Sequence, residues 1–214
     1  MHTASEKRQT TNTNSGEKRE LVLFDFDGTL TTKDTLAEFM IFYHGKAKYY
    51  LGLAILSPVM GLYLTGLMEN WKAKEIFLSW FLKNEEVSKF NERCTEFARR
   101  KLPGLVRKGA IDMIRKYRDN GATIAVVSAS AENWVKPFCD QHGLICLSTK
   151  LDAQNGTLTG KIAGKNCHGP EKVCRINEHF VLTGFDHIIA YGDTSGDKEM
   201  LALADTKFYK PFRD

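Results

Sequence analysis

A short apolar run followed at once by two acidic residues constrains the fold of this chain more than any other feature. The run is Leu21–Phe24, and the next five residues, Asp25–Thr29, read DFDGT. An apolar run of this length after the charged Glu20 predicts a strand buried within a parallel sheet. Because ligands of such sheets bind beyond the carboxyl ends of the strands, we expect both carboxylates in a functional site. Gly28 allows a tight turn out of the strand.

The composition indicates one sizeable core with a smaller inserted unit. The chain has 214 residues, 43% of them hydrophobic and 26% charged. Its net charge of +4 is too small to indicate a nucleic-acid partner. The five cysteines include no C-x-x-C pair, which argues against a disulfide framework or zinc site and favours a cytoplasmic protein with reduced thiols. Residues 1–19 are polar, so we predict a disordered tail there and no signal peptide.

Helical periodicity follows the DFDGT turn. Asp34 can cap a helix that begins near Thr35. Apolar side chains at helical spacing continue in Trp71–Phe81 and in Val87–Phe97. Pro103-Gly104 then interrupts the pattern. These observations predict an all-helical insertion.

Within this insertion, Tyr49–Met68 contains no charged residue. Its length, about 20 residues, would be enough to cross a membrane. A single crossing would separate Asp25 from Ser128, however, so we expect the segment to return to the side it left. Pro58 predicts the bend of a helical hairpin. A soluble hairpin would bury four leucines against Trp71–Phe81, whereas a hairpin in peripheral contact with a membrane would expose them: Leu53, Leu56, Leu62 and Leu64.

A second strand and a hairpin are predicted in the following part of the chain. Ala122–Val127 is apolar, and Ser128 follows it at the same sheet edge as Asp25. Ser130 can cap the next helix, so the amides of this turn can bind an anion. Asn155-Gly156, between two alternating runs, predicts a β-hairpin.

Lys172 and a last pair of carboxylates complete the polar clusters. Gly169–Lys172, with the sequence GPEK, opens a predicted helix in which Pro170 takes the first position. Lys172 then lies in the first turn, next to amides that favour an anion. Asp193 and Asp197 follow the last buried strand that we predict, and paired carboxylates suit a hard cation.

Taken in order, these four clusters resemble the four motifs of the haloacid dehalogenase-like superfamily, in the phosphoserine phosphatase-like branch known as subfamily IB. The resemblance covers nearly the whole chain after residue 20. It implies an α/β fold with a Rossmann-like three-layer core, a mainly parallel sheet and an inserted all-helical cap. We therefore assign residues 1–19 to the tail, residues 20–31 and 104–214 to the core, and residues 32–103 to the cap.

The resemblance also implies a Mg²⁺-dependent phosphomonoester hydrolase that works through an aspartyl-phosphate. Asp25 would attack phosphorus, Asp27 would protonate the leaving alcohol and then activate water, and Lys172 would stabilise negative charge. The other implied roles are phosphate or substrate binding by Ser128, Ala129, Gly28, Thr29 and Asp34, and Mg²⁺ binding by Asp25, Asp193, Asp197 and the carbonyl oxygen of Asp27. Asp197 would support the metal shell or orient Lys172.

The substrate implied is a small soluble phosphomonoester. Phosphoserine phosphatases pair an acidic residue at the entry of the cap with a cap arginine; Asp34 is near the first position, but only Lys72 and Lys74 are near the second. The layout is also similar to phosphatidylglycerophosphatases of the C type, which makes a lipid phosphate at a membrane surface the alternative. A non-catalytic phosphate-binding module is a second alternative, but it predicts the loss of a motif residue and none is missing. The sequence does not indicate an oligomeric state.

Overall fold

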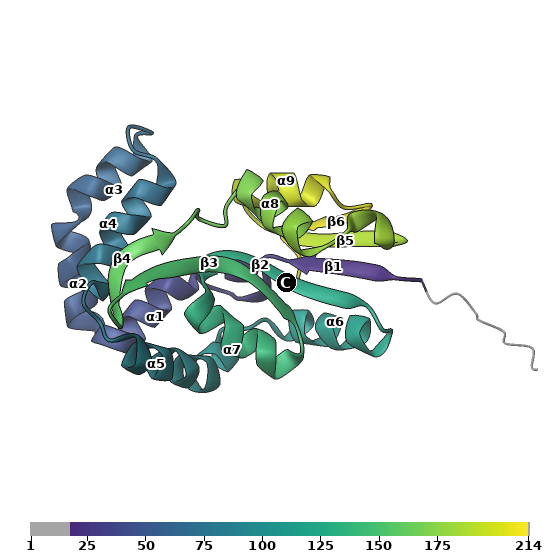
Figure 1. The fold of residues 1–214 in the computed structure, drawn as a ribbon, viewed down its shortest axis with the longest axis horizontal. Helices are drawn as coiled ribbons and strands as arrows, with labels where there is room; N and C mark the ends of the chain where they lie inside the picture. The colour runs from purple at the N-terminus through teal and green to yellow at the C-terminus, as the bar shows by residue number, and fades with distance from the viewer. Residues whose placement is uncertain (1–17, 214) are drawn as a thin grey trace, which may run out of the picture.

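The computed structural model describes residues 18–213. Almost all of the tail predicted for residues 1–19 therefore lies outside the described residues. The described chain forms a layered core with a group of helices beside one end of its sheet (Figure 1).

The core is built on a six-stranded sheet with the order β4-β3-β2-β1-β5-β6. Every neighbouring pair is parallel except β3 and β4. This confirms the predicted α/β class with a mainly parallel sheet. The strands are β1 (Glu20–Phe24), β2 (Thr123–Ala131), β3 (Ile145–Gln154), β4 (Thr157–Ala163), β5 (His187–Gly192) and β6 (Thr206–Tyr209).

Helices cover both faces of this sheet (Figure 1). The flanking helices are α6 (Lys108–Asp119), α7 (Glu132–His142), α8 (Pro170–His179) and α9 (Lys198–Ala202). The side chains of β1 alternate between the faces: Val22 and Phe24 are buried in the cluster that includes Trp134 of α7, whereas Leu21 and Leu23 are buried in the cluster that includes Ile176 of α8. Burial on both faces explains why the sequence of β1 is continuously apolar.

The hairpin between β3 and β4 turns at Asn155 and Gly156, as predicted. Both residues have a positive φ, 49° and 79°. A two-residue hairpin turn of this kind favours Asn-Gly because its twist matches that of the strands.

Five α-helices lie between β1 and α6 in the chain: α1 (Thr35–His44), α2 (Lys46–Ile55), α3 (Ser57–Leu64), α4 (Asn70–Leu82) and α5 (Val87–Arg100). We call them the cap, and we keep the division into core and cap as a proposal. Asp34 caps α1 as predicted, since its carboxylate accepts from the backbone N–H groups of Leu36 and Ala37 at 2.8 and 3.3 Å.

Of the helical hairpin predicted within Tyr49–Met68, the two short helices and a bend near Pro58 are confirmed, whereas the reversal of the chain between them is wrong. α2 and α3 are separated only by Leu56, and the direction of the chain changes by 59° between them, which is too little for a hairpin. The chain returns through α4 rather than α3. Pro58 lies in the first turn of α3, where its missing N–H breaks no helical hydrogen bond, so the helix restarts in a new direction without reversing. Among the described helices none is by itself long and apolar enough to cross a membrane, and the bent pair passes only by length and composition.

The four leucines singled out in this segment are not buried alike. Leu56 is only 8% exposed, whereas Leu62 and Leu64 are 43% and 76% exposed. The burial expected of a soluble hairpin therefore holds for Leu56 and fails for Leu62 and Leu64. We define the apolar cap surface as the large exposed hydrophobic residues of α2–α4 and their loops: Tyr50, Leu51, Ile55, Met60, Leu62, Leu64, Leu67, Trp71, Ile76 and Trp80.

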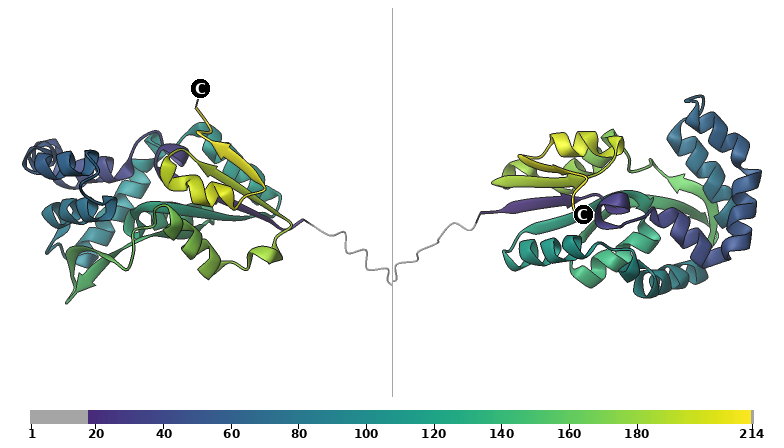
Figure 2. Two further views of the ribbon diagram at one scale, coloured as in Figure 1. Left: turned by 90° about the horizontal axis from the view of Figure 1, so that it is seen from above. Right: turned by 180° about the vertical axis from the view of Figure 1, so that it is seen from behind.

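α4 is attached to the hairpin strand β4, beside which it runs in the views of Figures 1 and 2. Ser79 Oγ donates to the Gly160 carbonyl oxygen at 3.1 Å, and the Ile162 N–H donates to Glu75 at 2.9 Å. A Cβ on Gly160 would lie 2.4 Å from Ser79 Cα, so only glycine allows this approach. The contact fixes one wall of the cap over the end of the sheet.

Candidate active site

A cavity of about 790 Å³ lies between the cap and the carboxyl ends of the central strands. It contains most of the predicted site residues. The core lines it with Asp25, Asp27, Gly28, Ala129, Ser130, Lys172, Asp193 and Asp197, and the cap side with Asp34, Tyr49, Leu53, Met60, Tyr63, Asn70, Lys74 and Phe77. The cavity therefore has an acidic floor and a largely apolar outer wall.

Asp25 follows β1, and its N–H donates to the Tyr191 carbonyl oxygen of β5 at 2.9 Å. The Lys172 ammonium donates to Asp25 Oδ1 at 2.6 Å, to Asp197 Oδ1 at 2.7 Å and to the Val127 carbonyl oxygen at 2.7 Å. These bonds use all three donors of the lysine. Because Lys172 is 2% exposed, its charge is held in one place between two buried carboxylates.

The pKa values of these three groups follow from burial and from their mutual attraction. Burial raises the pKa of Asp25 to about 7, although the Lys172 charge opposes the shift. Burial alone would lower the pKa of Lys172, but the charges of Asp25 and Asp197 outweigh it and raise that pKa. Burial also acts to raise the pKa of Asp197, but Lys172 holds it below its ordinary value. Lys172 and Asp197 are therefore a charged pair at neutral pH.

Asp27 has different partners, although it is only two residues from Asp25. Its Oδ1 accepts from the N–H and the hydroxyl of Thr35, both at 2.6 Å, and its Oδ2 accepts from Ser130 Oγ at 2.6 Å. Burial and the charge of Asp34 raise the pKa of Asp27, against the effect of these hydrogen bonds. A carboxyl group with a raised pKa is suited to proton transfer near neutral pH.

Asp193 follows β5 and lies against the DFDGT turn. Thr29 Oγ1 donates to Asp193 Oδ1 at 3.4 Å, and Arg213 donates to Asp193 Oδ2 at 2.7 Å. A Cβ on Gly28 would lie 2.4 Å from Asp193 Oδ2, so this turn needs glycine for space as well as for its φ of +80°. Burial and the charge of Asp197 raise the pKa of Asp193, whereas Arg213 lowers it.

The residues present fit a divalent cation. Oxygen atoms of Asp25, Asp193 and Asp197 lie within 4.8 Å of one another, and all three residues are buried. Ligands consisting only of carboxylate oxygens suit Mg²⁺. The carboxylate of Asp27 is directed to Thr35 and Ser130 instead, so a contribution from Asp27 would come from its carbonyl oxygen, as predicted from the family pattern.

The turn after β2 differs from its prediction. Ser130 was expected to cap α7, but the N-cap position is Ala131, and the Ser130 hydroxyl donates to Asp27. Ser128 is fully buried, its Oγ accepts from the Ser130 N–H at 3.0 Å, and the described residues that line the cavity here are Ala129 and Ser130. Ser128 therefore shapes the turn and also contacts Asp27, since its Oγ donates to Asp27 Oδ2 at 3.4 Å, while the residues that line the cavity here are the two after it.

The cap contributes a half-buried cation to the cavity. Lys74 on α4 donates to the Ala129 carbonyl oxygen and to Asn166 Oδ1, the latter at 2.9 Å. Burial lowers the pKa of Lys74 to about 8, against the attraction of Asp27 and Asp34. Lys74 thus joins the cap to the core near the carboxylates.

Two cavity residues had no signal in the sequence. Asn166 is a loop residue between β4 and α8, and Arg213 is a lone arginine after the last strand. Neither stands in a motif, and each reaches the cavity only because distant segments fold together. His168 is exposed and also lines the cavity.

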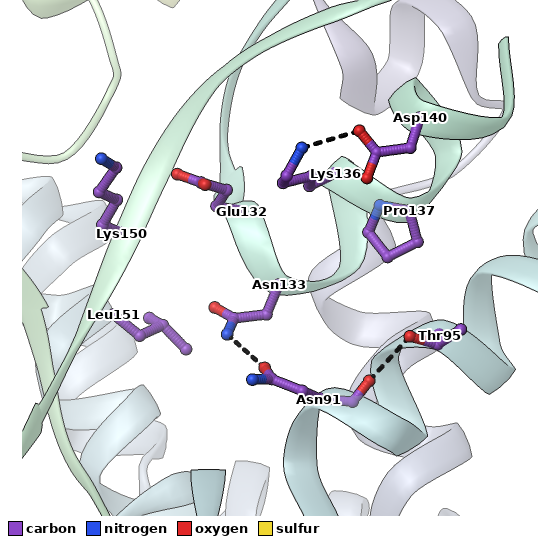
Figure 3. A pocket seen from close by; sticks show the side chains of 9 residues that line it. All are labelled: Asn91, Thr95, Glu132, Asn133, Lys136, Pro137, Asp140, Lys150 and Leu151. Carbon is purple, nitrogen blue, oxygen red and sulfur yellow. Dashed lines mark hydrogen bonds and ion pairs between the residues drawn. The ribbon is translucent and has the colours of Figure 1, made fainter. Parts of the chain in front are cut away.

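A second pocket, of about 490 Å³, lies between α5, α7 and β3 (Figure 3). Its polar side chains are largely paired with each other: Asn133 donates to Asn91 at 2.7 Å, and Lys136 donates to Asp140 at 2.7 Å. It contains none of the predicted site residues, so we place the candidate site in the larger cavity.

The chain matches the family described as haloacid dehalogenase-like hydrolase over residues 22–202. It is 37% identical to protein CicA of Caulobacter vibrioides over 202 residues, which are 92% of this chain and 89% of the relative. It is 26% identical to the phosphoserine phosphatase of Methanocaldococcus jannaschii over 200 residues, covering 89% and 85% of the two chains. Its fold is similar to a protein of unknown function from Bordetella pertussis Tohama I, with a TM-score of 0.77, 23% identity and 89% coverage of both chains.

Proposed function

Because the chain belongs to the haloacid dehalogenase-like hydrolases and is a phosphatase, we propose that it hydrolyses small phosphomonoesters with the help of Mg²⁺ and through an aspartyl-phosphate on Asp25. The observation that carries the proposal is the contrast between its two neighbouring carboxylates. Asp25 is bonded to a fixed ammonium within a carboxylate cluster, and Asp27 is bonded to hydroxyl and amide donors. This contrast supports Asp25 as the nucleophile and Asp27 as the acid and base.

In this proposal a carboxylate oxygen of Asp25 attacks phosphorus, and the bond from phosphorus to the leaving oxygen breaks. Asp27 gives its proton to that oxygen, and it then takes a proton from the water that hydrolyses the aspartyl-phosphate. Backbone N–H groups around Ala129 and Ser130 hold the phosphoryl oxygens, and Lys172 balances the negative charge of these oxygens. Asp25, Asp193 and the Asp27 carbonyl oxygen would hold Mg²⁺, which would supply positive charge that reduces repulsion between the substrate and the carboxylates. Asp197 orients Lys172.

The proposal is tested by assaying phosphate release from p-nitrophenyl phosphate and phosphoserine. We expect activity with Mg²⁺ that is lost with excess chelator and lost in Asp25→Asn. Asp112→Asn, an exposed carboxylate of α6, is the matched control and should keep wild-type activity. Turnover in Asp25→Asn at the wild-type rate would refute the nucleophile. No wild-type turnover of any monoester would favour a non-catalytic phosphate-binding module.

A second candidate function is hydrolysis of a lipid phosphate at a membrane surface. The apolar cap surface favours it, because it gathers many large exposed hydrophobic side chains on the consecutive helices α2–α4, and exposed apolar surface of this kind is typical of an interaction site. Met60 belongs both to that surface and to the cavity wall, so an acyl chain on the surface would be continuous with the acidic floor. The exposed Lys46, Lys48 and Lys72 flank the patch and complement anionic head groups.

Liposome co-sedimentation separates the two candidates. Wild-type protein and a Leu62→Asp, Leu64→Asp double variant are compared on vesicles with and without anionic lipid, and turnover of p-nitrophenyl phosphate reports folding. Wild-type binding that the variant loses, with turnover retained, supports the lipid substrate. No wild-type binding to either vesicle leaves the small soluble monoester.

A further inference from the structure

Arg213 is the one described residue after β6 that bonds to a member of the carboxylate cluster. Its guanidinium donates to Asp193 Oδ2 at 2.7 Å, and its side chain is 39% exposed, against 9% for Asp193. A buried carboxylate near a second carboxylate needs a partner to keep its charge and its orientation. Arg213 supplies both to Asp193 from the rim of the cavity.

The segment that carries Arg213 is fixed to the core at several points. The Lys210 N–H donates to the Gly192 carbonyl oxygen at 2.8 Å. The Phe212 ring stacks on Tyr191 with 5.5 Å between centroids, and the Phe212 carbonyl oxygen accepts from Arg107 at 3.4 Å. An exposed arginine on an unanchored segment would make only a weak surface pair. Here the backbone contacts hold the segment next to the site independently of the bond that the Arg213 side chain makes.

This path also requires an uncommon backbone. Lys210 and Phe212 have φ values of +53° and +60°, although neither is glycine. For a residue with a side chain this conformation is strained, and such strain persists where the surrounding contacts impose it. The two residues flank Pro211, and together they turn the chain from β6 back towards Asp193.

We propose that Arg213 is a positioning residue of the metal site: it holds the Asp193 carboxylate in the orientation that binds the divalent cation and thereby sets the affinity for that cation. The inference rests on the metal-dependent function proposed above. With Arg213 on Oδ2 of Asp193, the other oxygen, Oδ1, accepts from Thr29, so both oxygens are held while Asp193 contributes to the cluster. Groups that orient a metal ligand in this way typically change metal affinity about 10- to 100-fold when they are removed.

Two other roles for Arg213 predict different results. If Arg213 competes with the cation for Asp193, its removal will tighten metal binding. If it contacts the substrate phosphate instead, its removal will raise KM at saturating Mg²⁺ and leave metal affinity unchanged. A positioning role weakens metal binding and leaves KM at saturating Mg²⁺ close to that of the wild type.

The test is calorimetric titration of the full chain with Mn²⁺ and with Mg²⁺, beside kinetics with p-nitrophenyl phosphate. We expect Arg213→Ala to weaken binding about 10-fold or more. Arg213→Lys should lie between it and the wild type, since lysine keeps the charge but loses the planar pair of donors. Lys210→Gln removes one positive charge from the same segment without touching Asp193, and it should bind metal like the wild type.

Unchanged or tighter metal binding in Arg213→Ala overturns the inference, and a raised KM alone overturns it in favour of a substrate contact. If Arg213→Ala does not fold by circular dichroism, Arg213→Lys decides, and wild-type affinity in that variant overturns the inference. A wild type that binds neither metal refutes the metal site itself. That outcome differs from a wild type and a variant that bind equally well.

Discussion

Asp25 and Asp27 are separated by one phenylalanine, yet they have no hydrogen-bond partner in common. Asp25 bonds to Lys172, and Asp27 bonds to Thr35 and Ser130. The turn that begins at Phe26 sends the two side chains to different neighbours. A pair of carboxylates can therefore be given two chemical roles by the partners that surround them.

Asp27→Asn should slow both formation and hydrolysis of the aspartyl-phosphate, because one group serves as acid and then as base. The loss in rate should be about 10²- to 10⁴-fold, and larger for phosphoserine than for p-nitrophenyl phosphate, whose leaving group needs little protonation. Burst kinetics separate the two steps. Asp112→Asn, the exposed carboxylate of α6, is again the control and should leave both steps unchanged. A variant in which only metal affinity changes would contradict the acid and base role.

Lys172→Met should destabilise the fold by about 3–5 kcal/mol at pH 7, because it leaves two buried carboxylates without their cation. The unpaired Asp25 and Asp197 are neutral at low pH. The difference in the free energy of unfolding between the variant and the wild type should therefore narrow as the pH falls towards about 4 and widen as it rises to 7. Urea unfolding at both pH values measures this difference. Lys161→Met, at an exposed position of β4, should change the free energy of unfolding little at either pH. A loss of stability in Lys172→Met that does not depend on pH would disprove this account.

At the scale of single elements, the contact of α4 with β4 decides how the cap is held. Gly160→Ala places a methyl group 2.4 Å from Ser79 Cα and also strains a φ of +80°. Gly164→Ala has the same φ of +80° but meets nothing within 4 Å, so it measures the strain alone. We expect Gly160→Ala to be less stable than Gly164→Ala by about 1–3 kcal/mol in chemical unfolding. Equal losses would mean that this close contact does not stabilise the fold.

The elements that could be predicted from sequence are those specified by local chemistry. The apolar run of β1, the Asp34 cap and the Asn155-Gly156 turn each depend on residues within a few positions, and the structure confirms all three. The bend near Pro58 was predicted, but its size was not, because proline permits both a reversal of the chain and the start of a new helix in a moderately different direction. Packing against α4 decides between the two. Ser130, Lys74 and Arg213 acquire their partners only through tertiary contacts, which no local pattern encodes.

For the molecule as a whole, metal and stability should be coupled. Three clustered carboxylates repel one another, so a cation that binds only the folded chain stabilises it by about 2.7 kcal/mol at a concentration 100 times its Kd. Saturating Mg²⁺ should therefore raise the thermal midpoint by several degrees, and chelator should reverse the change. Asp193→Asn should lose this response. An unchanged wild-type midpoint at saturating Mg²⁺ would contradict the coupling.

β1 lies between β2 and β5 in the sheet, although it is the earliest strand of the chain. The pairs Asp27–Ser128 and Thr29–Asp193, which join its turn to those strands, are 101 and 164 residues apart. A ribosome adds about 5–20 residues per second, so Leu21–Phe24 leaves it on the order of ten seconds before its first partner strand. The cap helices also leave the ribosome before β2, but α4 packs on β4 and Phe39 of α1 stacks on Trp134 of α7, so the cap completes its packing only when those later segments have emerged. During synthesis β1 should thus stay an unpaired apolar segment, and a chaperone should hold it until β2 emerges.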